Sequence, residues 1–227
     1  MKTFLLVGAN SAIAKACNAM LQASGSQTIG LSRGVLDGFN KAHQLVDYNK
    51  VHLPVIEEPI DGLVYFPGTI NLKPFHRIGK EEFVHDFNVN TMGAVEVLQT
   101  YFPNLKKGNQ PSIVLLSSVA AQTGLPFHSS ISMAKAAIEG LALALAAEWA
   151  PTIRVNVVAP SLTESPLSER FLSTPEKTDA AQNRNPMKKV GSTKEIAEAI
   201  CFLLNDSSSW MTGQVIAVDG GYGKLRL

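Results

Sequence analysis

The feature that most constrains the fold is the alternation of short apolar runs with longer segments of helical period. Short runs bounded by turn residues predict buried strands, and apolar residues recurring every three to four positions predict helices. The expected strands are 3–7, 27–31, 43–46, 62–66, 112–116, 153–158 and 214–218, and the expected helices are 12–23, 80–105, 130–149 and 193–204. This order is typical of βαβ units. We therefore expect an α/β protein with a doubly wound Rossmann fold, in which a mostly parallel seven-stranded sheet carries helices on both faces.

The domain organisation is simple, because no internal repeat, low-complexity tract or Gly/Ser-rich linker divides the chain. We expect a single dinucleotide-binding domain over residues 1–227. The exception in the pattern is 161–187, which is rich in Ser, Thr, Glu and Pro and interrupts the alternation just after an expected strand. An insertion of this kind usually covers a ligand, so it is predicted to be a substrate lid.

Charge and cysteine content exclude several functional classes. Twenty basic and nineteen acidic residues leave a formal net charge of +1, so no whole-molecule field would gather nucleic acid or an anionic membrane. No run of about 18 uninterrupted apolar residues occurs, and a membrane span is not expected. Cys17 and Cys201 lie far apart and form no metal-binding spacing. We expect two buried free thiols, no metal site and a cytoplasmic protein.

A candidate phosphate site follows the first expected strand, where Gly8-Ala9-Asn10-Ser11-Ala12-Ile13-Ala14 leads directly into a helix. In a Rossmann unit, small residues at this turn let backbone amides and a helix N-terminus face a pyrophosphate. The candidate cofactor-binding residues here are Gly8, Asn10, Ser11, Ala12 and Ile13. A tight strand-to-helix turn without a ligand remains the alternative.

The end of the second expected strand indicates which nucleotide would fit. An acidic residue there would bind the ribose 2'-hydroxyl of NAD, but this chain has Ser32-Arg33. A hydroxyl and a guanidinium suit a 2'-phosphate, since arginine forms charge-assisted and often bidentate hydrogen bonds. Arg33 could also be a solvated surface arginine. The βαβ context favours NADP(H) as the cofactor.

Further motifs follow in order along the chain, namely Asn88-Val89-Asn90, Ser117-Ser118-Val119, Ala134-Lys135-Ala136-Ala137, 154–161 and Val218-Asp219-Gly220-Gly221. Together with the Gly8 turn they resemble the classical short-chain dehydrogenase/reductase family, from about Thr3 to about Tyr222. The turn departs from the family's pattern, with alanine at two of its glycine positions. The segment Tyr65-Phe66-Pro67-Gly68 keeps only the glycine of the family's Asn-Asn-Ala-Gly.

This resemblance implies a nicotinamide cofactor and adds residues to its site. Asp47, in Val46-Asp47, matches the family residue that contacts the adenine. The further cofactor-binding positions it implies are Tyr48, Phe66, Pro67, Gly68, Lys135, Pro160, Leu162 and Thr163.

The resemblance also implies a catalytic set of Asn90, Ser118 and Lys135. In the family, a tyrosine four residues before the lysine exchanges the proton, but that position is Ile131 here. An aliphatic side chain cannot do this, and loss of a general acid typically costs about 10² to 10⁴-fold in rate. His128 is a candidate replacement because imidazole suits proton transfer near neutral pH, although a loop histidine is more often structural. Tyr65 is a weaker candidate.

Three functions remain open at this point. The first is an NADPH-dependent oxidoreductase acting on a carbonyl or alcohol, with Ser118 polarising the oxygen, Lys135 orienting the cofactor, and His128 or water supplying the proton. The second is an NADPH-binding protein without redox turnover, with a regulatory or scaffold role, which Ile131 favours. The third is a non-redox lyase or isomerase that uses His128 as its base.

The expected partners are a small molecule and further copies of the chain. The substrate pocket is expected to be walled by apolar side chains with a few hydroxyls, so a medium-sized, partly apolar substrate is predicted. Its expected lining is Leu125, Pro126, Phe127, Leu162, Thr163, Ser165, Leu167, Phe171 and Leu172. The Ala- and Leu-rich helix over 133–149 predicts a homodimer or homotetramer, with 222–227 near an interface.

Overall fold

The computed structural model of the protein describes residues 1–45 and 53–225. Within these residues seven parallel strands form one sheet, in the order β3-β2-β1-β4-β5-β6-β7. The strands are β1 (Thr3–Val7), β2 (Gln27–Ser32), β3 (Lys41–Gln44), β4 (Gly62–Tyr65), β5 (Ser112–Leu116), β6 (Arg154–Pro160) and β7 (Val215–Val218). The predicted Rossmann α/β fold is confirmed.

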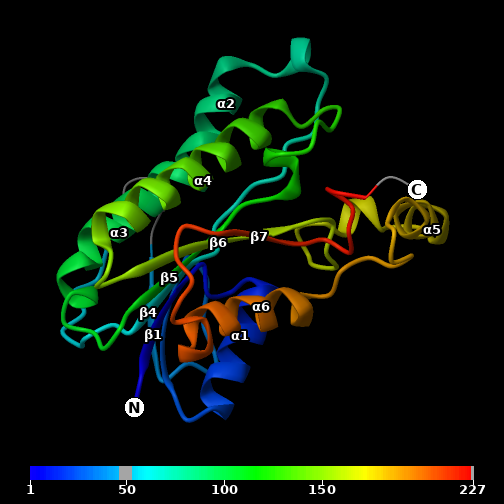
Figure 1. Ribbon diagram of the computed structural model, residues 1–227. Helices are drawn as coiled ribbons and strands as arrows, with labels where there is room; N and C mark the ends of the chain where they lie inside the picture. Colours follow the sequence, from blue (N-terminus) through cyan, green and yellow to red (C-terminus); the bar gives the residue numbers. More distant parts are fainter. Residues whose placement is uncertain (46–52, 226–227) are drawn as a thin grey trace.

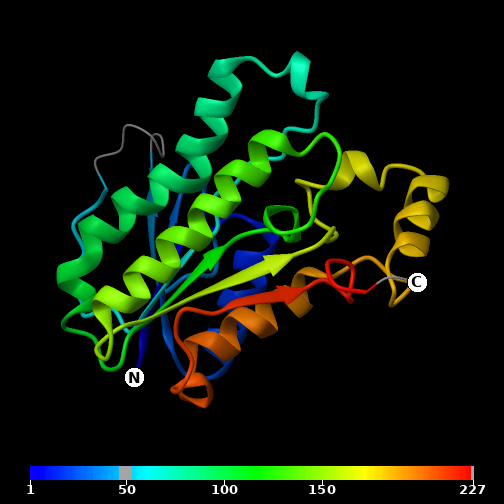
Figure 2. The same cartoon turned by 45° about the horizontal axis from the view of Figure 1, so that its top comes forward.

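Helices cover both faces of the sheet, as Figures 1 and 2 show. α1 (Ala12–Ala23) and α6 (Thr193–Leu204) pack side by side on one face. On the other lie α2 (Lys80–Phe87), α3 (Gly93–Leu105) and α4 (Ser129–Trp149), with a π-helical segment, η2 (Asn88–Met92), joining α2 to α3. Short 3-10 helices are η1 (Phe75–Arg77), η3 (Val119–Ala121), η4 (Glu169–Phe171) and η5 (Asp206–Ser208).

Two hydrophobic clusters hold the layers together, and alternate residues of each central strand belong to different clusters. In β1, Leu5 and Val7 face α3 and α4, whereas Phe4 and Leu6 face α1 and α6. This period of two is what a strand buried on both faces requires, and it explains why the strand reads as a continuous apolar run.

The predicted elements are all present in the described residues, with shifted ends. The largest strand shift is in β3, which begins at Lys41 rather than at 43 and ends at Gln44. This strand lies at the edge of the sheet and is mostly exposed, so it carries little apolar signal. The predicted helix 80–105 is interrupted by the π-helical turn of η2, and 161–187 contains an unpredicted helix, α5 (Pro175–Arg184).

Two sequence expectations concern helices and thiols. α4 is long and apolar enough to cross a membrane by length and composition, but in the fold it packs on β5 and β6 and contributes Ile138, Ala142 and Ala146 to the core. A core helix passes the same test of length and composition.

Cys17 of α1 and Cys201 of α6 are free and buried within the same cluster.

Candidate active site

The predicted site residues gather beyond the carboxyl ends of the strands. Figure 2 shows the arrowheads of β5, β6 and β7 pointing toward the end of the molecule that carries the 117–128 loop, the start of α4 and α5. β1 lies between β2 and β4, and successive strands are added on opposite sides of it. Ligands of open parallel sheets bind at such a switch point.

The Gly8 turn is closely packed against the end of β4. Gly8 has a φ of +79°, and a Cβ there would lie 2.9 Å from Cδ of Pro67. The amides of Gly8 and Ala9 both donate to the carbonyl of Leu31, at 2.8 and 3.0 Å. These two amides therefore fix the turn to β2 and are not free for a phosphate. Only glycine combines this backbone angle with this contact.

Free amides are found one step further on, at the N-terminus of α1. Ser11 is the N-cap, and its hydroxyl accepts from the amide of Ala14 at 3.2 Å. In the described part of the chain, the amides of Ala12 and Ile13 have no protein acceptor. Two unpaired donors at the positive end of a helix dipole form an anion site.

At the end of β2, one candidate cofactor-binding residue is exposed to solvent and the other is buried. Arg33 is exposed, whereas Ser32 is fully buried and its hydroxyl accepts from the amide of Gly34 at 3.2 Å. A Cβ on Gly34 would lie 3.5 Å from Nδ2 of Asn10, so this loop lies beside the Gly8 turn. Arg33 therefore belongs to a loop that lies beside the Gly8 turn, and Ser32 helps to shape that loop. Asp47 and Tyr48 lie outside the described residues.

Gly68, Asn90 and Lys135 meet at the centre of the edge. A Cβ on Gly68 would lie 3.1 Å from Oδ1 of Asn90 and 3.5 Å from Nζ of Lys135. Asn90 is fully buried in η2, yet its Oδ1 has no hydrogen-bond partner. A buried polar atom without a partner usually marks a water or ligand contact. A side chain at position 68 would therefore crowd Asn90 and Lys135.

Lys135 is a buried cation held by one bond. Its Nζ donates to the carbonyl of Leu116 at 2.7 Å, which leaves two further N–H groups for a ligand. Burial lowers the pKa of Lys135 to about 8, because removal from water disfavours the charged form.

Ser118 is a predicted catalytic residue, and Ile131 stands where the family resemblance implies a proton-exchanging tyrosine. Ser118 caps η3, and its hydroxyl accepts from the amide of Ala120 at 3.2 Å, so its own proton remains available. Ile131 is buried in the first turns of α4, with 5% of its surface exposed. Its apolar side chain is part of the packing and offers no proton.

His128 and Tyr65, the two candidate replacements for the missing proton donor, differ in how their polar atoms are bonded. Nδ1 of His128 lies 2.7 Å from the carbonyl of Pro126, an acceptor, so Nδ1 carries the proton and Nε2 is the free ring nitrogen. Tyr65 is buried, and its hydroxyl donates to the carbonyl of Val89 at 2.7 Å. The hydroxyl of Tyr65 therefore bonds β4 to η2.

The segment 161–187 begins at the end of β6. Pro160 ends the strand, Leu162 is partly buried, and Thr163 pairs with Gly191 in an isolated parallel bridge. Further along, a guanidinium nitrogen of Arg170 donates to the carbonyl of Ile70 at 2.7 Å. This bond joins 161–187 to the β4–α2 loop across the carboxyl edge.

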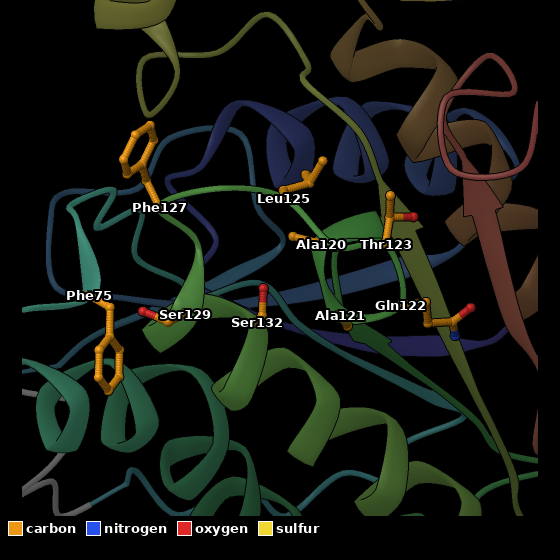
Figure 3. A pocket seen from close by; sticks show the side chains of 10 residues that line it. Phe75, Ala120, Ala121, Gln122, Thr123, Leu125, Phe127, Ser129 and Ser132 are labelled. Carbon is orange, nitrogen blue, oxygen red and sulfur yellow. The ribbon is translucent and has the colours of Figure 1, made fainter. Parts of the chain in front are cut away.

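A hollow of about 350 Å³ opens beside the start of α4; we call it the α4 pocket. Figure 3 shows Phe75 and Phe127 on one side, Gln122 and Thr123 on the other, and Ser129 and Ser132 between them. Its lining is Phe75, Ala120, Ala121, Gln122, Thr123, Gly124, Leu125, Phe127, Ser129 and Ser132. No charged side chain is among these residues.

The hollow shares part of its lining with the expected substrate pocket. Leu125 and Phe127 line it, whereas the lining does not include Pro126, Leu162, Thr163, Ser165, Leu167, Phe171 and Leu172, whose role at a substrate stays a prediction. Within the described residues, no cluster of three or more His, Cys, Asp or Glu side chains could hold a metal.

Several residues at the site were not found from the sequence. Phe75 reaches the α4 pocket from the β4–α2 loop, and Thr69 and Asp86 bond to one another beside Asn90. Ser117, next to Ser118, donates to Glu139 at 2.7 Å and ties its loop to α4. The only local signal was for Asp86, because a carboxyl four residues before a helical asparagine lies on the same face of the helix.

The chain is similar to known proteins over most of its length. Residues 44–223 match the model of a family described as enoyl-(acyl carrier protein) reductase. The chain is 33% identical over 241 residues to the 3-oxoacyl-[acyl-carrier-protein] reductase FabG of Thermotoga maritima, covering 97% of each protein. It is 29% identical over 231 residues to L-xylulose reductase of Bos taurus, covering 96% of this chain and 95% of that protein.

The fold is shared with a solved structure. Ligand-free aldohexose dehydrogenase of Thermoplasma acidophilum superposes with a TM-score of 0.89 at 24% identity, covering 99% of this chain and 95% of that one. At this identity the likeness concerns the fold alone.

Proposed function

Because the chain belongs to the short-chain dehydrogenase/reductase family, whose members bind a nicotinamide cofactor, we propose that it is an NADPH-dependent oxidoreductase acting on a carbonyl or alcohol. The observation that carries this proposal is the buried ammonium of Lys135, which has two free N–H groups beside Gly68 and the unpaired Oδ1 of Asn90. This is the arrangement that a polar nucleotide ribose needs.

The residues at the carboxyl edge fit such a cofactor along its length. The free amides of Ala12 and Ile13 would hold the pyrophosphate, and Arg33 would bind a 2'-phosphate. No acidic side chain follows β2 directly to repel that phosphate. Phe66, Pro67, Gly68, Pro160, Leu162 and Thr163 would line the remaining length of the site. Bound nicotinamide would supply the redox chemistry of the reaction.

The substrate is proposed to bind in the α4 pocket. Its apolar side chains and hydroxyls, and the absence of charge among its lining residues, fit a medium-sized, neutral and partly apolar molecule. Ser118 would donate a hydrogen bond to the reacting oxygen, and Lys135 would hold the ribose. Since Ile131 cannot exchange a proton, the donor in carbonyl reduction would be water or the imidazolium form of His128, in which Nε2 carries a proton as well as Nδ1, and turnover would be slow.

The second candidate function is cofactor binding without redox turnover. The specific observation favouring it is the burial of Ile131. A packed apolar side chain stands at the position where a proton donor is expected. In this function NADPH would still bind, and the bound state would serve regulation or assembly. A non-redox lyase or isomerase using His128 is the third alternative.

The cofactor proposal is tested by fluorescence titration with NADPH and NADH. We expect NADPH to bind more tightly, and Arg33→Ala to weaken NADPH about tenfold or more while leaving NADH little changed, because a charge-assisted contact is lost. Arg77→Ala, which removes another exposed arginine, is the matched control and should leave both affinities unaltered. If neither nucleotide binds, the proposal is wrong.

Turnover is tested separately with a panel of neutral ketones and the variant Ile131→Tyr. We expect slow oxidation of NADPH by the unmodified protein, and a gain of about 10² or more in the variant. If the unmodified protein binds NADPH but shows no turnover until tyrosine is introduced, the non-redox function is favoured. Loss of residual turnover in His128→Ala would identify His128 as the donor, and unchanged turnover would identify water.

A further inference from the structure

Asp86 is a buried acid that the proposed chemistry does not use. Only 1% of its surface is exposed, and no cation in the described residues forms an ion pair with it. Its Oδ1 accepts from the hydroxyl of Thr69 at 2.6 Å, and its Oδ2 has no hydrogen-bond partner. Burying a carboxylate without compensation is costly, so its surroundings should contain a balancing charge.

Hydrogen-bond directions connect Asp86 to the centre of the site. Nδ2 of Asn90 lies 2.7 Å from the backbone carbonyl of Asp86, and a carbonyl can only accept, so this atom is the amide nitrogen. The same nitrogen donates to the hydroxyl of Thr69 at 2.9 Å. The proton of Thr69 is therefore directed to Oδ1 of Asp86, which accepts it. Oδ1 of Asn90 is directed the other way, toward Gly68 and Lys135.

Lys135 is a candidate for the balancing charge, because its ammonium and Oδ1 of Asn90 both lie beside Gly68. α4 packs against α2, η2, η3, β5 and β6, and among these η2, η3 and β5 carry no titratable side chain. On α2, Lys80, Glu81 and His85 are exposed and Glu82 is bonded to Lys73, while Arg154 of β6 bonds to Ser208. On α4, Glu139 is held by Ser117 and Gln122, and Glu148 is exposed.

We propose that Asp86 is a positioning residue for Lys135, whose buried carboxylate, acting through Thr69 and Asn90, keeps the ammonium of Lys135 charged and directed toward Gly68. Asp86, Thr69 and Asn90 form one hydrogen-bonded chain, and Lys135 lies beside the end of that chain, where a Cβ on Gly68 would be 3.1 Å from Oδ1 of Asn90 and 3.5 Å from Nζ of Lys135. Opposite charges in such buried surroundings stabilise one another more strongly than in water. The role in catalysis rests on the proposed function, since Lys135 matters there as a donor to the cofactor ribose.

The test is an NMR titration of lysine in the cofactor-free protein, with Lys135→Arg used to assign the signal. Asp86→Asn keeps the shape of the side chain and removes its charge. We expect the titration of Lys135 to move to lower pH by about one unit, as for opposite charges at an effective dielectric constant near 20. An unchanged titration of Lys135 in a folded Asp86→Asn protein overturns the proposal.

Glu139→Gln is the matched control, because it removes a carboxylate one turn from Lys135 on the same helix. That carboxylate is partly exposed and bonded to other groups, so we expect a clearly smaller shift. An equal shift in the two variants would show a general effect of charge and contradict a specific role for Asp86. A second measurement needs no variant, because the carboxyl ¹³C signal of Asp86 should report the ionised form at pH 7. A protonated Asp86 overturns the proposal.

The consequence for the cofactor is measured independently. NADPH binding should weaken at a pH about one unit lower in Asp86→Asn than in the unmodified protein. In a Lys135→Arg background, Asp86→Asn should leave this pH dependence unchanged, since a guanidinium stays charged over this range. The lysine titration uses no cofactor, so it decides the role of Asp86 whether or not NADPH binds or is oxidised.

Discussion

Burial of Lys135 links the site to the stability of the fold. Its pKa falls from an ordinary 10.5 to about 8, so below pH 8 the folded state holds a charge that it disfavours. Between pH 8 and 10.5 the unfolded chain keeps the proton that the folded chain has lost, and stability rises with pH. In an Asp86→Asn background, where no buried carboxylate loses its balancing charge, we expect Lys135→Met to raise the free energy of unfolding by about 3 kcal/mol at pH 7, and to abolish cofactor binding.

This gain should disappear by about pH 10.5, when the unfolded chain also begins to lose the proton. Urea unfolding at pH 7 and pH 10.5 measures it. Lys107→Met, at an exposed position, is the control and should change stability by less than about 0.5 kcal/mol at both pH values. A destabilised Lys135→Met protein at pH 7 would show that the bond to Leu116 outweighs the burial of charge.

Gly8 and Gly25 allow the energetic cost of backbone strain to be distinguished from the cost of close packing. Gly8 and Gly25 both have a φ of +79°, but a Cβ on Gly25 meets nothing within 4 Å, whereas one on Gly8 lies 2.9 Å from Pro67. We expect Gly25→Ala to lower the free energy of unfolding by about 1 kcal/mol, and Gly8→Ala by about 2 to 4 kcal/mol. Chemical denaturation measures both. Equal losses would mean that Pro67 yields to the new methyl group.

At the scale of elements, the junction between α2 and α3 depends on one tyrosine. A Cβ on Gly93 would lie 2.2 Å from the hydroxyl of Tyr65, which itself bonds to the carbonyl of Val89 in η2. We expect Gly93→Ala to destabilise by about 3 kcal/mol and Tyr65→Phe by about 1 kcal/mol. The double variant should lose clearly less than their sum, since removing the hydroxyl also removes the clash.

The control for this cycle is Gly140→Ala, in the interior of α4. A Cβ there meets nothing within 4 Å, so the substitution should stabilise the helix by about 1 kcal/mol. Additive losses in the Gly93 and Tyr65 double variant would contradict the contact. The same cycle bears on function, because NADPH turnover that survives Tyr65→Phe excludes Tyr65 as the proton donor.

Helices and strands were predictable where the sequence signal was local. η2 and α5 were not predicted, for different reasons. The π-helical turn of η2 depends on Asn90 bonding back to the carbonyl of Asp86, and the apolar period continues through it, so periodicity alone cannot show it. The N-terminus of α5 carries a local sequence signal. Thr174 caps the helix, Pro175 stands at its first position and Glu176 follows.

At the scale of the whole molecule, the sequence predicted the residues at strand ends but not most contacts between distant segments. Gly8 follows from the turn after the first expected strand, and Asn90, Ser118 and Lys135 follow from motifs that resemble the short-chain dehydrogenase/reductase family; their roles stay predictions. Phe75 was missed because its place in the α4 pocket depends on how the β4–α2 loop crosses the edge. That path is set by long-range packing, which no local pattern encodes.

Assembly is the remaining prediction for the whole molecule. Leu143 and Met133 of α4 are 62% and 46% exposed, and a groove between α4 and β7 runs along the unpaired edge of the sheet. Apolar side chains beside an unpaired strand favour association of copies. We expect a dimer or tetramer by light scattering, dissociated by Leu143→Glu. A monomer mass for the unmodified protein would contradict this.

The bond from Arg170 to the carbonyl of Ile70 places unequal evolutionary constraints on its two ends. A backbone carbonyl is supplied by any amino acid, so position 70 can change its side chain without losing the bond. Position 170 has no such freedom, because few side chains reach that far with a fixed donor. The side chain at position 70 can therefore vary while the segment opposite it stays anchored.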